Sequence, residues 1–436
     1  MSVELKDTFL QLVRLGAGAD ANAVSNSMYF DQLSINQDSS SFDWEELQNL
    51  AAEQGLSAIV LDGIERLPDS ARPPKVALLQ WIGEVLQQEA QQASQRKTAM
   101  EMAQLFHDNG IRTYVLKGAV VAECYPKPGH RVSVDLDCFL SETVQGSRFK
   151  VQDDGCQGHF DAWERGDELI RAKGYEVETV FYKNSSFFLP DLMVENHRFL
   201  TPFRGNKRLK SLERLLQRLI NQNENDPSTS SGQVNVGSPD GSKLEENFTQ
   251  NLSNSQLTTD SKLSTLNSEL DKFEGTELWR PPVMVSALFL IEHAYSHFLH
   301  EGLTWKHVLD WVMFSKKHQE EIDWKEFDAR IDEFGFRKFY DVFNGIGQDA
   351  FGNDSSRIRE LENSNSNSKL KSLMLADIWA PLDLHESVRG LKGKLALVGN
   401  TWRARWKYRY FTDMNWIEAL WIQVKGFLFE KEPTLY

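Results

Sequence analysis

The segment from Tyr114 to Leu140 reads YVLKGAVVAECYPKPGHRVSVDLDCFL and determines how the core folds. It opens on the end of a short β-branched and aromatic run, IRTYVLKG, which predicts a strand that stops at a glycine turn. AVVA then predicts the start of a helix, and VDLDCFL alternates as a strand does. Side chains two residues apart on a strand share one face, so Asp135 and Asp137 project together, with Cα atoms roughly 6.6 Å apart.

Two carboxylates on one face predict a site for a cation. If their oxygens lie about 4 Å apart, the charges repel by about 4 kcal/mol at an effective dielectric of 20, unless a cation or a proton separates them. Mg²⁺ (or Mn²⁺) suits such a site, because carboxylate oxygens hold it while positions stay open for water and phosphate. We expect both side chains to be exposed in a cleft, so that replacing Asp135 or Asp137 by Ala removes activity and leaves the fold intact.

A later strand offers a third carboxylate. Glu195 lies in the apolar extended run MVENH, and His197 follows it on the same face. Upstream, Lys117 and Gly118 close a strand just where a helix opens, so a cation and bare backbone N–H groups are available for phosphate. An Asp-x-Asp pair is also common on a solvated strand face, and Arg131 could simply pair with Asp135 and orient it.

Taken together, these residues resemble a known pattern. The pattern consists of Lys117-Gly118 at a strand-to-helix turn, Arg131-x-Ser133-x-Asp135-x-Asp137, and one acidic residue on a later strand. It is similar to the DNA polymerase β-like nucleotidyltransferase superfamily, and most closely to its uncharacterised nucleotidyltransferase family with an LKG turn and an R-x-x-x-D-[IL]-D strand. The resemblance covers roughly Trp44 to Leu200, with a looser match from Phe289 to Trp311.

The resemblance implies a function and assigns roles to single residues. Asp135, Asp137 and Glu195 would be catalytic and would bind the metal. Lys117, Gly118, Arg131 and Ser133 would bind a nucleoside triphosphate such as ATP. The reaction would move a nucleoside monophosphate to an acceptor and release pyrophosphate. The alternative is a non-catalytic nucleotide-binding regulatory module, of the kind found in toxin–antitoxin systems.

A second histidine-rich segment, LIEHAYSHFLH, has a helical period and carries His293, His297 and His300 on one side. This spacing formally permits a zinc site, although histidines satisfied inside a core are the more common case. The resembling family has an H-x-x-x-H helix followed by a basic-x-x-x-Asp helix, matched here by Lys306 and Asp310. The resemblance therefore implies that this helical segment packs over the cleft and that His293 or His297 lines the cleft. His197 would line the same cleft from the core.

Composition limits the partners. The chain has 436 residues, is 41% hydrophobic, and carries 48 Lys and Arg against 63 Asp and Glu, a formal net charge of −15. An acidic protein repels nucleic acid, so RNA contacts would need a local basic stretch, such as residues 204–218 or 402–411. Nucleic acid is not favoured, and a small-molecule, protein or RNA acceptor stays open.

Cysteine usage and hydropathy indicate the compartment. The chain has three cysteines, too few and too irregularly spaced for a disulfide framework, which favours the reducing cytoplasm. No apolar run approaches the 18 or so residues that would span a bilayer, so we expect no membrane partner.

The order of segments predicts an α+β protein in four parts. A polymerase β-like nucleotidyltransferase core with a small mixed sheet is flanked by N-terminal helices and a mainly helical C-terminal domain. Residues 221–275 are rich in Ser, Asn, Thr and Gln and predict a disordered insertion or linker. The expected parts are 1–95 (helical), 96–220 (the core), 221–275 (the insertion) and 276–436 (helical).

Overall fold

The computed structural model describes residues 1–19, 42–142, 157–181, 183–202, 206–224, 271–352, 368–380, 399, 402–413 and 415–421. Seven strands in this part of the chain form one mixed sheet, in the order β3-β4-β5-β2-β1-β7-β6. The strands are β1 (Ile111–Val115), β2 (Asp135–Glu142), β3 (Val177–Phe181), β4 (Asn184–Leu189), β5 (Leu192–His197), β6 (Asp271–Lys272) and β7 (Leu278–Arg280). The α+β prediction is confirmed, and the sheet is mixed as expected.

The sheet is built around the segment from Tyr114 to Leu140. β1 pairs antiparallel with β2, and β2 pairs parallel with β5. β3 and β4 pair antiparallel as a hairpin, and β5, the later strand expected to carry Glu195, follows them. The short strands β6 and β7 extend the sheet beyond β1. β6 lies in the part predicted as an insertion, 221–275, and β7 lies in the part predicted as helical, 276–436.

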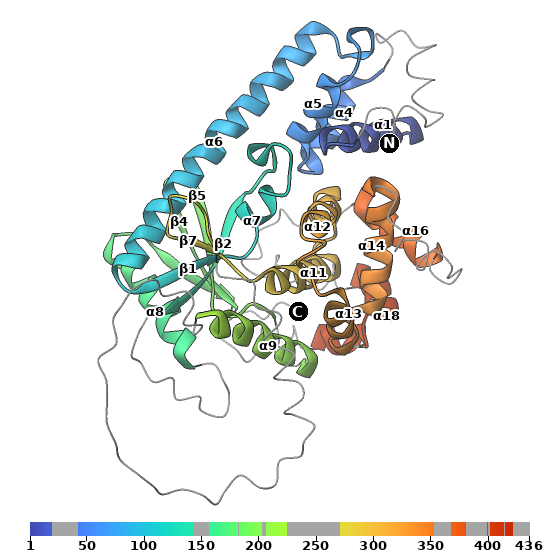
Figure 1. Cartoon of the computed structure of the whole chain (residues 1–436). Helices are drawn as coiled ribbons and strands as arrows, with labels where there is room; N and C mark the ends of the chain where they lie inside the picture. Colours follow the sequence, from blue (N-terminus) through green and yellow to red (C-terminus); the bar gives the residue numbers. More distant parts are fainter. Residues whose placement is uncertain are drawn as a thin grey trace, which may run out of the picture.

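Helices surround this sheet on several sides (Figure 1). They are α1 (Val3–Gly16), α4 (Trp44–Glu53), α5 (Ser57–Glu65), α6 (Lys75–Asp108), α7 (Ala119–Ala122), α8 (Gln157–Ala172), α9 (Lys207–Glu224), α11 (Val283–His300), α12 (Trp305–Lys317), α13 (Trp324–Glu333), α14 (Arg337–Phe351), α16 (Ser368–Trp379) and α18 (Arg405–Phe411). Among the described residues, no helix combines the length and the apolar character needed to cross a bilayer.

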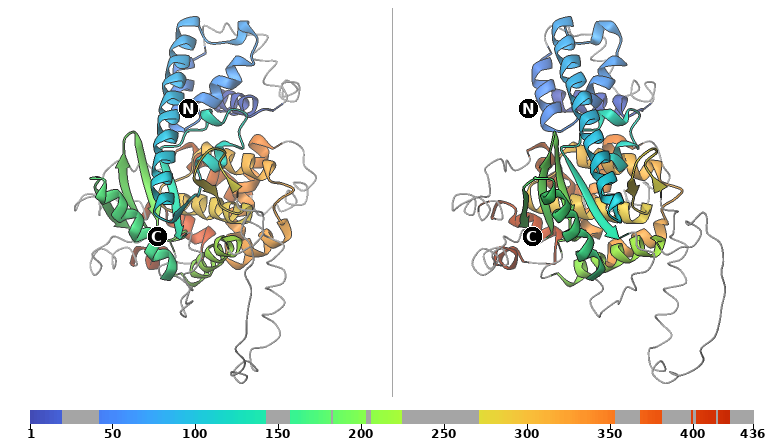
Figure 2. Two further views of the ribbon diagram at one scale, coloured as in Figure 1. Left: turned by 60° about the vertical axis from the view of Figure 1, so that its left-hand side comes forward. Right: turned by 90° about the vertical axis from the view of Figure 1, so that its left-hand side faces the viewer.

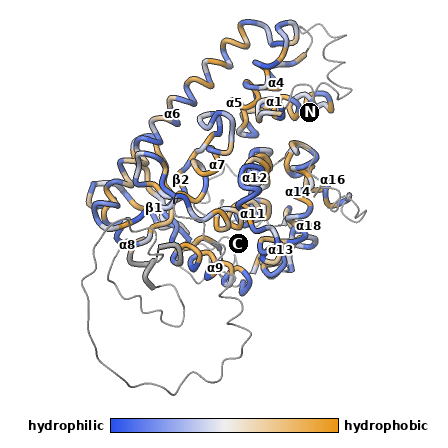
Figure 3. The backbone as a smooth tube through the Cα atoms, in the orientation of Figure 1, coloured by the Kyte–Doolittle hydropathy of each residue, from blue (hydrophilic) through white to orange (hydrophobic). Residues whose placement is uncertain are grey.

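The long helix α6 joins the N-terminal helices to the sheet. With 34 residues it is about 50 Å long, and Figure 2 shows it running from α4 and α5 at one end to the strands at the other. Polar and apolar residues alternate along its tube in Figure 3, and it buries only a few side chains, among them Trp81, Met102 and Phe106. The expected boundary at 95/96 falls inside this helix, and the one at 275/276 falls between β6 and β7.

Close helix packing at the N-terminus depends on glycine. A Cβ on Gly63 of α5 would lie 2.1 Å from the Leu12 backbone oxygen of α1, and one on Gly16 would lie 1.9 Å from the Ile59 oxygen. Only glycine allows the backbones to approach so closely. Between α4 and α5 the chain turns at Gly55, whose φ of +69° ends α4.

The two faces of the sheet have different neighbours. Gly166 of α8 packs against Leu140 of β2, beside Asn196 of β5 and Phe106 of α6. The alternation of a strand turns Asp137 and His197 to the other face, where the His197 ring lies 6.2 Å from the Phe289 ring of α11. One face is therefore a structural core, and the other faces the C-terminal helices.

Two regions of biased composition lie mostly outside the described residues. The residues outside the description include 225–270 of the predicted insertion and 353–367 of a second polar segment. Cys156 also lies outside the described residues. The basic and aromatic stretch 402–411 is described, and it is exposed at Trp402, Arg403, Arg405 and Arg409 but buried at Lys407, Tyr408 and Phe411. Lys407 is 1% exposed, and its Nζ lies 2.7 Å from Asp377 Oδ1 and donates to the Phe298 oxygen at 2.6 Å.

Candidate active site

The acidic side chains meet where β2 runs parallel to β5. Asp137 pairs in register with Glu195, and Phe139 pairs with His197. Because alternate residues share a face, Asp135, Asp137, Glu195 and His197 all project to the side of α11. The side chains of Asp137 and His197 are 1% and 2% exposed, whereas those of Asp135 and Glu195 are 26% and 29% exposed. The site thus has an inner buried pair and an outer accessible pair.

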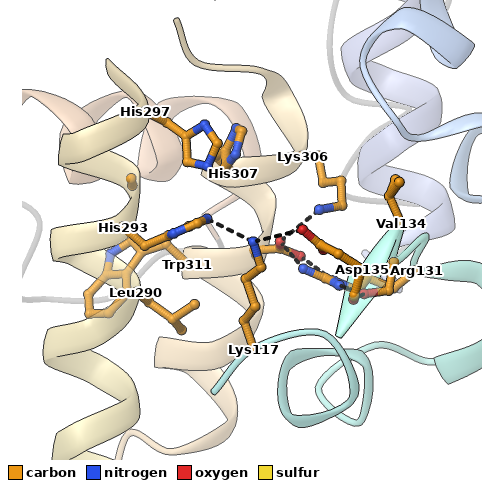
Figure 4. Close-up of a pocket in the computed structure, with 13 residues that line it drawn as sticks. Lys117, Arg131, Val134, Asp135, Leu290, His293, His297, Lys306, His307 and Trp311 are labelled. Carbon is orange, nitrogen blue, oxygen red and sulfur yellow. Dashed lines mark hydrogen bonds and ion pairs between the residues drawn. The ribbon is translucent and has the colours of Figure 1, made fainter. Parts of the chain in front are cut away.

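Lys117 lies between the two aspartates. Its Nζ is 3.0 Å from Asp137 Oδ2 and 3.9 Å from Asp135 Oδ2. The same ammonium donates to His293 Nε2 at 3.1 Å, as Figure 4 shows. Burial alone would lower the pKa of Lys117, but the charges of Asp137 and Asp135 outweigh it and raise the pKa above its usual value. Lys117 is therefore a permanent cation at the carboxylate pair.

His197 forms a hydrogen bond with the buried carboxylate of Asp137. Its Nδ1 donates to the Phe199 carbonyl oxygen at 3.3 Å, and its Nε2 donates to Asp137 Oδ1 at 2.9 Å. Because both ring nitrogens face acceptors, the ring is protonated. Burial alone would lower the pKa of His197, but the hydrogen bonds to Asp137 and Glu195 outweigh it and raise the pKa. With both nitrogens donating, His197 positions Asp137 and has no free lone pair of its own.

The two aspartates have opposite pKa shifts. Burial raises the pKa of Asp135, and the neighbouring Asp137 charge raises it further against the opposing charge of Lys117. Burial acts the same way on Asp137, but Lys117 and the hydrogen bond from His197 outweigh it, so the pKa of Asp137 lies below its usual range. Asp137 is thus ionised in the folded protein without any added ion. The prediction that both aspartates are exposed is wrong for Asp137.

The turn before α7 is tightly held. Gly118 has φ +63°, and a Cβ there would lie 2.9 Å from Ser133 Oγ. Ser133 Oγ donates to the Asp135 carbonyl oxygen at 3.0 Å, and Gln92 Nε2 of α6 donates to the Ser133 oxygen at 2.7 Å. Gly118 is required because only glycine combines this φ with this contact. The helix α7 that follows is four residues long.

Arg131 pairs with a helix and not with Asp135. Its Nε and Nη2 donate to Asp310 Oδ1 and Oδ2 of α12 at 3.1 and 2.7 Å. Tyr125 donates to the same Oδ1 at 2.7 Å. Burial alone would raise the pKa of Asp310, but Arg131 and Lys306 outweigh it and lower the pKa. Arg131 therefore joins the core to the helical part, although its Nη1 also lies 3.5 Å from Ser133 Oγ.

A cavity of about 180 Å³ lies between the carboxylate strand and α11 and α12 (Figure 4). Lys117, Arg131, Ser133 and Asp135 line it from the core. From the helices it is lined by His293, His297, His307, Lys306, Asp310 and Trp311, among others. His293 and His297 are at this cavity, as the resemblance implies, whereas His197 lies behind Asp137.

Sequence reasoning missed two residues of this region. His307, and not His300, completes a histidine cluster with His293 and His297, with ring nitrogens within 4.8 Å of one another. Tyr125 is the other residue that was missed. It belongs to the site because it donates to Asp310, which is 185 residues away in the sequence. Local spacing could not reveal either residue. His307 lies in α12 and Tyr125 contacts α12, and α12 reaches the site only through tertiary packing.

One buried acid gives a pH-dependent prediction. Glu292 of α11 is 1% exposed, and among the described residues its Oε2 has no hydrogen-bond partner. Burial raises the pKa of Glu292 from 4.5 to about 7, against the opposing charge of Lys183. The folded state then binds more protons than the unfolded chain between these values, so this residue's contribution to stability falls as pH rises through about 7.

We expect Glu292→Gln to remove this dependence. The variant should unfold in urea with a flatter profile between about pH 4.5 and 7, and with a free energy of unfolding higher by on the order of 2 kcal/mol near pH 8. The exposed Glu320→Gln on the turn after α12 is the matched control. A Glu292→Gln profile that follows the wild type at every pH would contradict the burial of this charge.

Residues 40–239 match a family model described as "Uncharacterised nucleotidyltransferase". No curated protein and no solved structure matches the chain. The family match includes the turn at Lys117 and the strands with Asp135, Asp137 and Glu195, and it ends before β6. The helices α11 and α12 that close the cavity lie beyond it.

Proposed function

We propose that this chain, whose residues 40–239 match the model of an uncharacterised nucleotidyltransferase family, moves a nucleoside monophosphate from a nucleoside triphosphate to an acceptor. An acceptor oxygen attacks the α-phosphorus, the bond between the α-phosphorus and the bridging oxygen breaks, and pyrophosphate leaves. The observation that carries the proposal is the pairing of Asp137 with Glu195 across parallel strands, with Asp135 on the same face and Lys117 between the aspartates.

A divalent ion, Mg²⁺ or Mn²⁺, fits this site. Asp135, Asp137 and Glu195 would hold it, since hard cations prefer carboxylate oxygens. Two observations support the fit. Oδ2 of Asp137 is buried and accepts no hydrogen bond of good geometry beyond its ion pair with Lys117. A carboxylate oxygen of Asp137 and one of Glu195 also lie within 4.8 Å of each other. When bound, the ion would offset the negative charge of the phosphates.

The chain's own residues supply position, charge and a base. Lys117 places a fixed positive charge where the phosphates of the donor would lie. Glu195, which is partly exposed beside the buried pair, is the candidate base that takes the proton of the acceptor hydroxyl. His197 keeps Asp137 ionised and oriented. Gly118 and Ser133 hold the turn against the carboxylate strand, and Arg131 keeps α12 over the cavity.

Transfer of an α-phosphate label tests the proposal. Each of the four nucleoside triphosphates, labelled at the α-phosphate, is incubated with the protein, Mg²⁺ or Mn²⁺, and a cell extract that supplies acceptors. We expect label to enter RNA, protein or a small molecule with the wild type and not with Asp135→Asn. The class of labelled product identifies the acceptor.

The same experiment addresses the non-catalytic alternative. A regulatory module would bind a triphosphate in the presence of the ion and return the α-phosphate label intact from every extract fraction. Binding without transfer across extracts and purified candidate acceptors would contradict catalysis and favour a sensing role for the same site.

A further inference from the structure

The cavity between the carboxylate strand and the helices α11 and α12 is too small for a whole nucleotide. Its volume of about 180 Å³ compares with the roughly 300 to 1,000 Å³ of pockets that hold complete small-molecule ligands. It opens beside Asp135 and Lys117, at the proposed reaction site. A small group that extends from that site, and not a base or a sugar, is therefore the occupant that fits.

The charges around the cavity favour an anion. Asp310 already accepts from Arg131 through both oxygens, and from Tyr125. Lys306 Nζ lies 3.6 Å from Oδ2 of Asp310, and the Lys306 side chain is 22% exposed. The charge of Asp310 is already balanced by Arg131, so Lys306 has no carboxylate of its own. Burial and the charges of Arg131 and Lys117 together lower the pKa of Lys306 to about 8, against the opposing charge of Asp310. An anion in the cavity would compensate this cation.

The histidines of the cavity offer proton donors. His307 Nδ1 accepts from the Thr304 N–H at 3.1 Å, so in the neutral ring the proton is on Nε2. His293 Nε2 accepts from Lys117, which leaves the proton on Nδ1. Burial lowers the pKa of both rings well below the usual value, so both are neutral.

The same tautomers disfavour zinc at the cluster of His293, His297 and His307. A metal needs a bare lone pair on each ring, and the Nε2 of His307 carries its proton in this hydrogen-bond pattern. Lys117 also donates to His293 Nε2, so this nitrogen offers no bare lone pair to a metal.

We propose that this cavity binds the two terminal phosphates of the triphosphate donor, with Lys306 and His307 as the contacts supplied by the helical part. Both residues lie in the first turn of α12, a 13-residue helix whose N-terminal end favours negative charge. Arg131 and Asp310 hold that end of α12 against the core. The inference rests on the proposed function. It places the two terminal phosphates of the donor in the cavity and the α-phosphate beside the carboxylates of Asp135 and Asp137.

Binding of inorganic tripolyphosphate tests the inference without turnover. Calorimetric titrations compare the wild type with Lys306→Met, Lys306→Arg and a control on the same helix, the exposed Lys316→Met. We expect Lys306→Met to weaken binding about 10- to 100-fold, the loss of one charged hydrogen bond. Lys306→Arg should restore most of the affinity, and Lys316→Met should match the wild type.

Several results would overturn the inference. They are unchanged tripolyphosphate binding by a folded Lys306→Met protein, no binding by the wild type, and tight Zn²⁺ binding that His307→Ala abolishes. Circular dichroism and the melting temperature show whether each variant folds. Failure of the proposed function is distinguishable: a protein that binds tripolyphosphate through Lys306 but never transfers the α-phosphate label keeps the site and loses the reaction.

Discussion

Replacing Asp135 by Asn should reduce nucleotidyl transfer by about a thousandfold or more while leaving the fold intact. The Asp135 side chain is 26% exposed and lines the cavity. Burial and the Asp137 charge raise the pKa of Asp135, so its ionised form is unfavourable in the folded protein and its removal costs no stability. The measurement is the rate of α-phosphate label transfer together with urea unfolding.

Asp137→Asn distinguishes the role of the buried carboxylate of Asp137 from that of the more exposed Asp135. Asp137 contacts Lys117 and His197, both cationic, and its side chain is 1% exposed. Removing its charge leaves Lys117 with the more distant Asp135 at 3.9 Å and His197 with Glu195 at 3.6 Å, which should cost about 3 to 5 kcal/mol of stability in addition to the loss of transfer. The control for both variants is Asp69→Asn, whose side chain is 94% exposed. An Asp137→Asn protein as stable as Asp135→Asn would contradict the buried geometry of the site.

Arg131→Met should give the largest loss of stability outside the carboxylates, about 3 to 5 kcal/mol in urea unfolding. The Arg131 and Asp310 side chains are 3% and 7% exposed, and the bidentate pair joins the core to α12. Without Arg131, the Asp310 carboxylate keeps only Tyr125 and the more distant Lys306.

A surface pair provides the comparison for Arg131→Met. Lys97 and Glu101 of α6 lie 3.8 Å apart with side chains 79% and 69% exposed, so Lys97→Met should change stability by less than about 1 kcal/mol. Arg131→Met combined with Asp310→Asn should recover part of the loss, because the uncompensated carboxylate is then gone. Equal effects of Arg131→Met and Lys97→Met would show that the buried pair does not hold α12 in place.

The carboxylate strands could be predicted because their signal is local. Alternation in VDLDCFL and in MVENH fixes which residues share a face, and a glycine turn marks the end of β1. The structure brings Asp135, Asp137, Glu195 and Lys117 together, and the match of residues 40–239 to an uncharacterised nucleotidyltransferase family confirms the resemblance. The catalytic roles of these residues remain a proposal.

The partner of Arg131 and the helical side of the cavity could not be predicted in the same way. Arg131 meets Asp310 across 179 residues of chain, and no spacing rule connects them. The basic-x-x-x-Asp spacing of Lys306 and Asp310 is visible in the sequence, but the direction in which α12 packs is not. Burial of Asp137 escaped prediction for the same reason, because it depends on Lys117 and His197 arriving from other strands.

The most direct test of the reaction follows two labels in one experiment. With the triphosphate labelled at the α-phosphate in one sample and at the γ-phosphate in another, nucleotidyl transfer moves only the α label to the acceptor and releases the γ label as pyrophosphate. We predict this outcome for the wild type with Mg²⁺ or Mn²⁺, and loss of both signals in Asp135→Asn. Transfer of the γ label to the acceptor, or α transfer that persists in Asp135→Asn, would contradict the account.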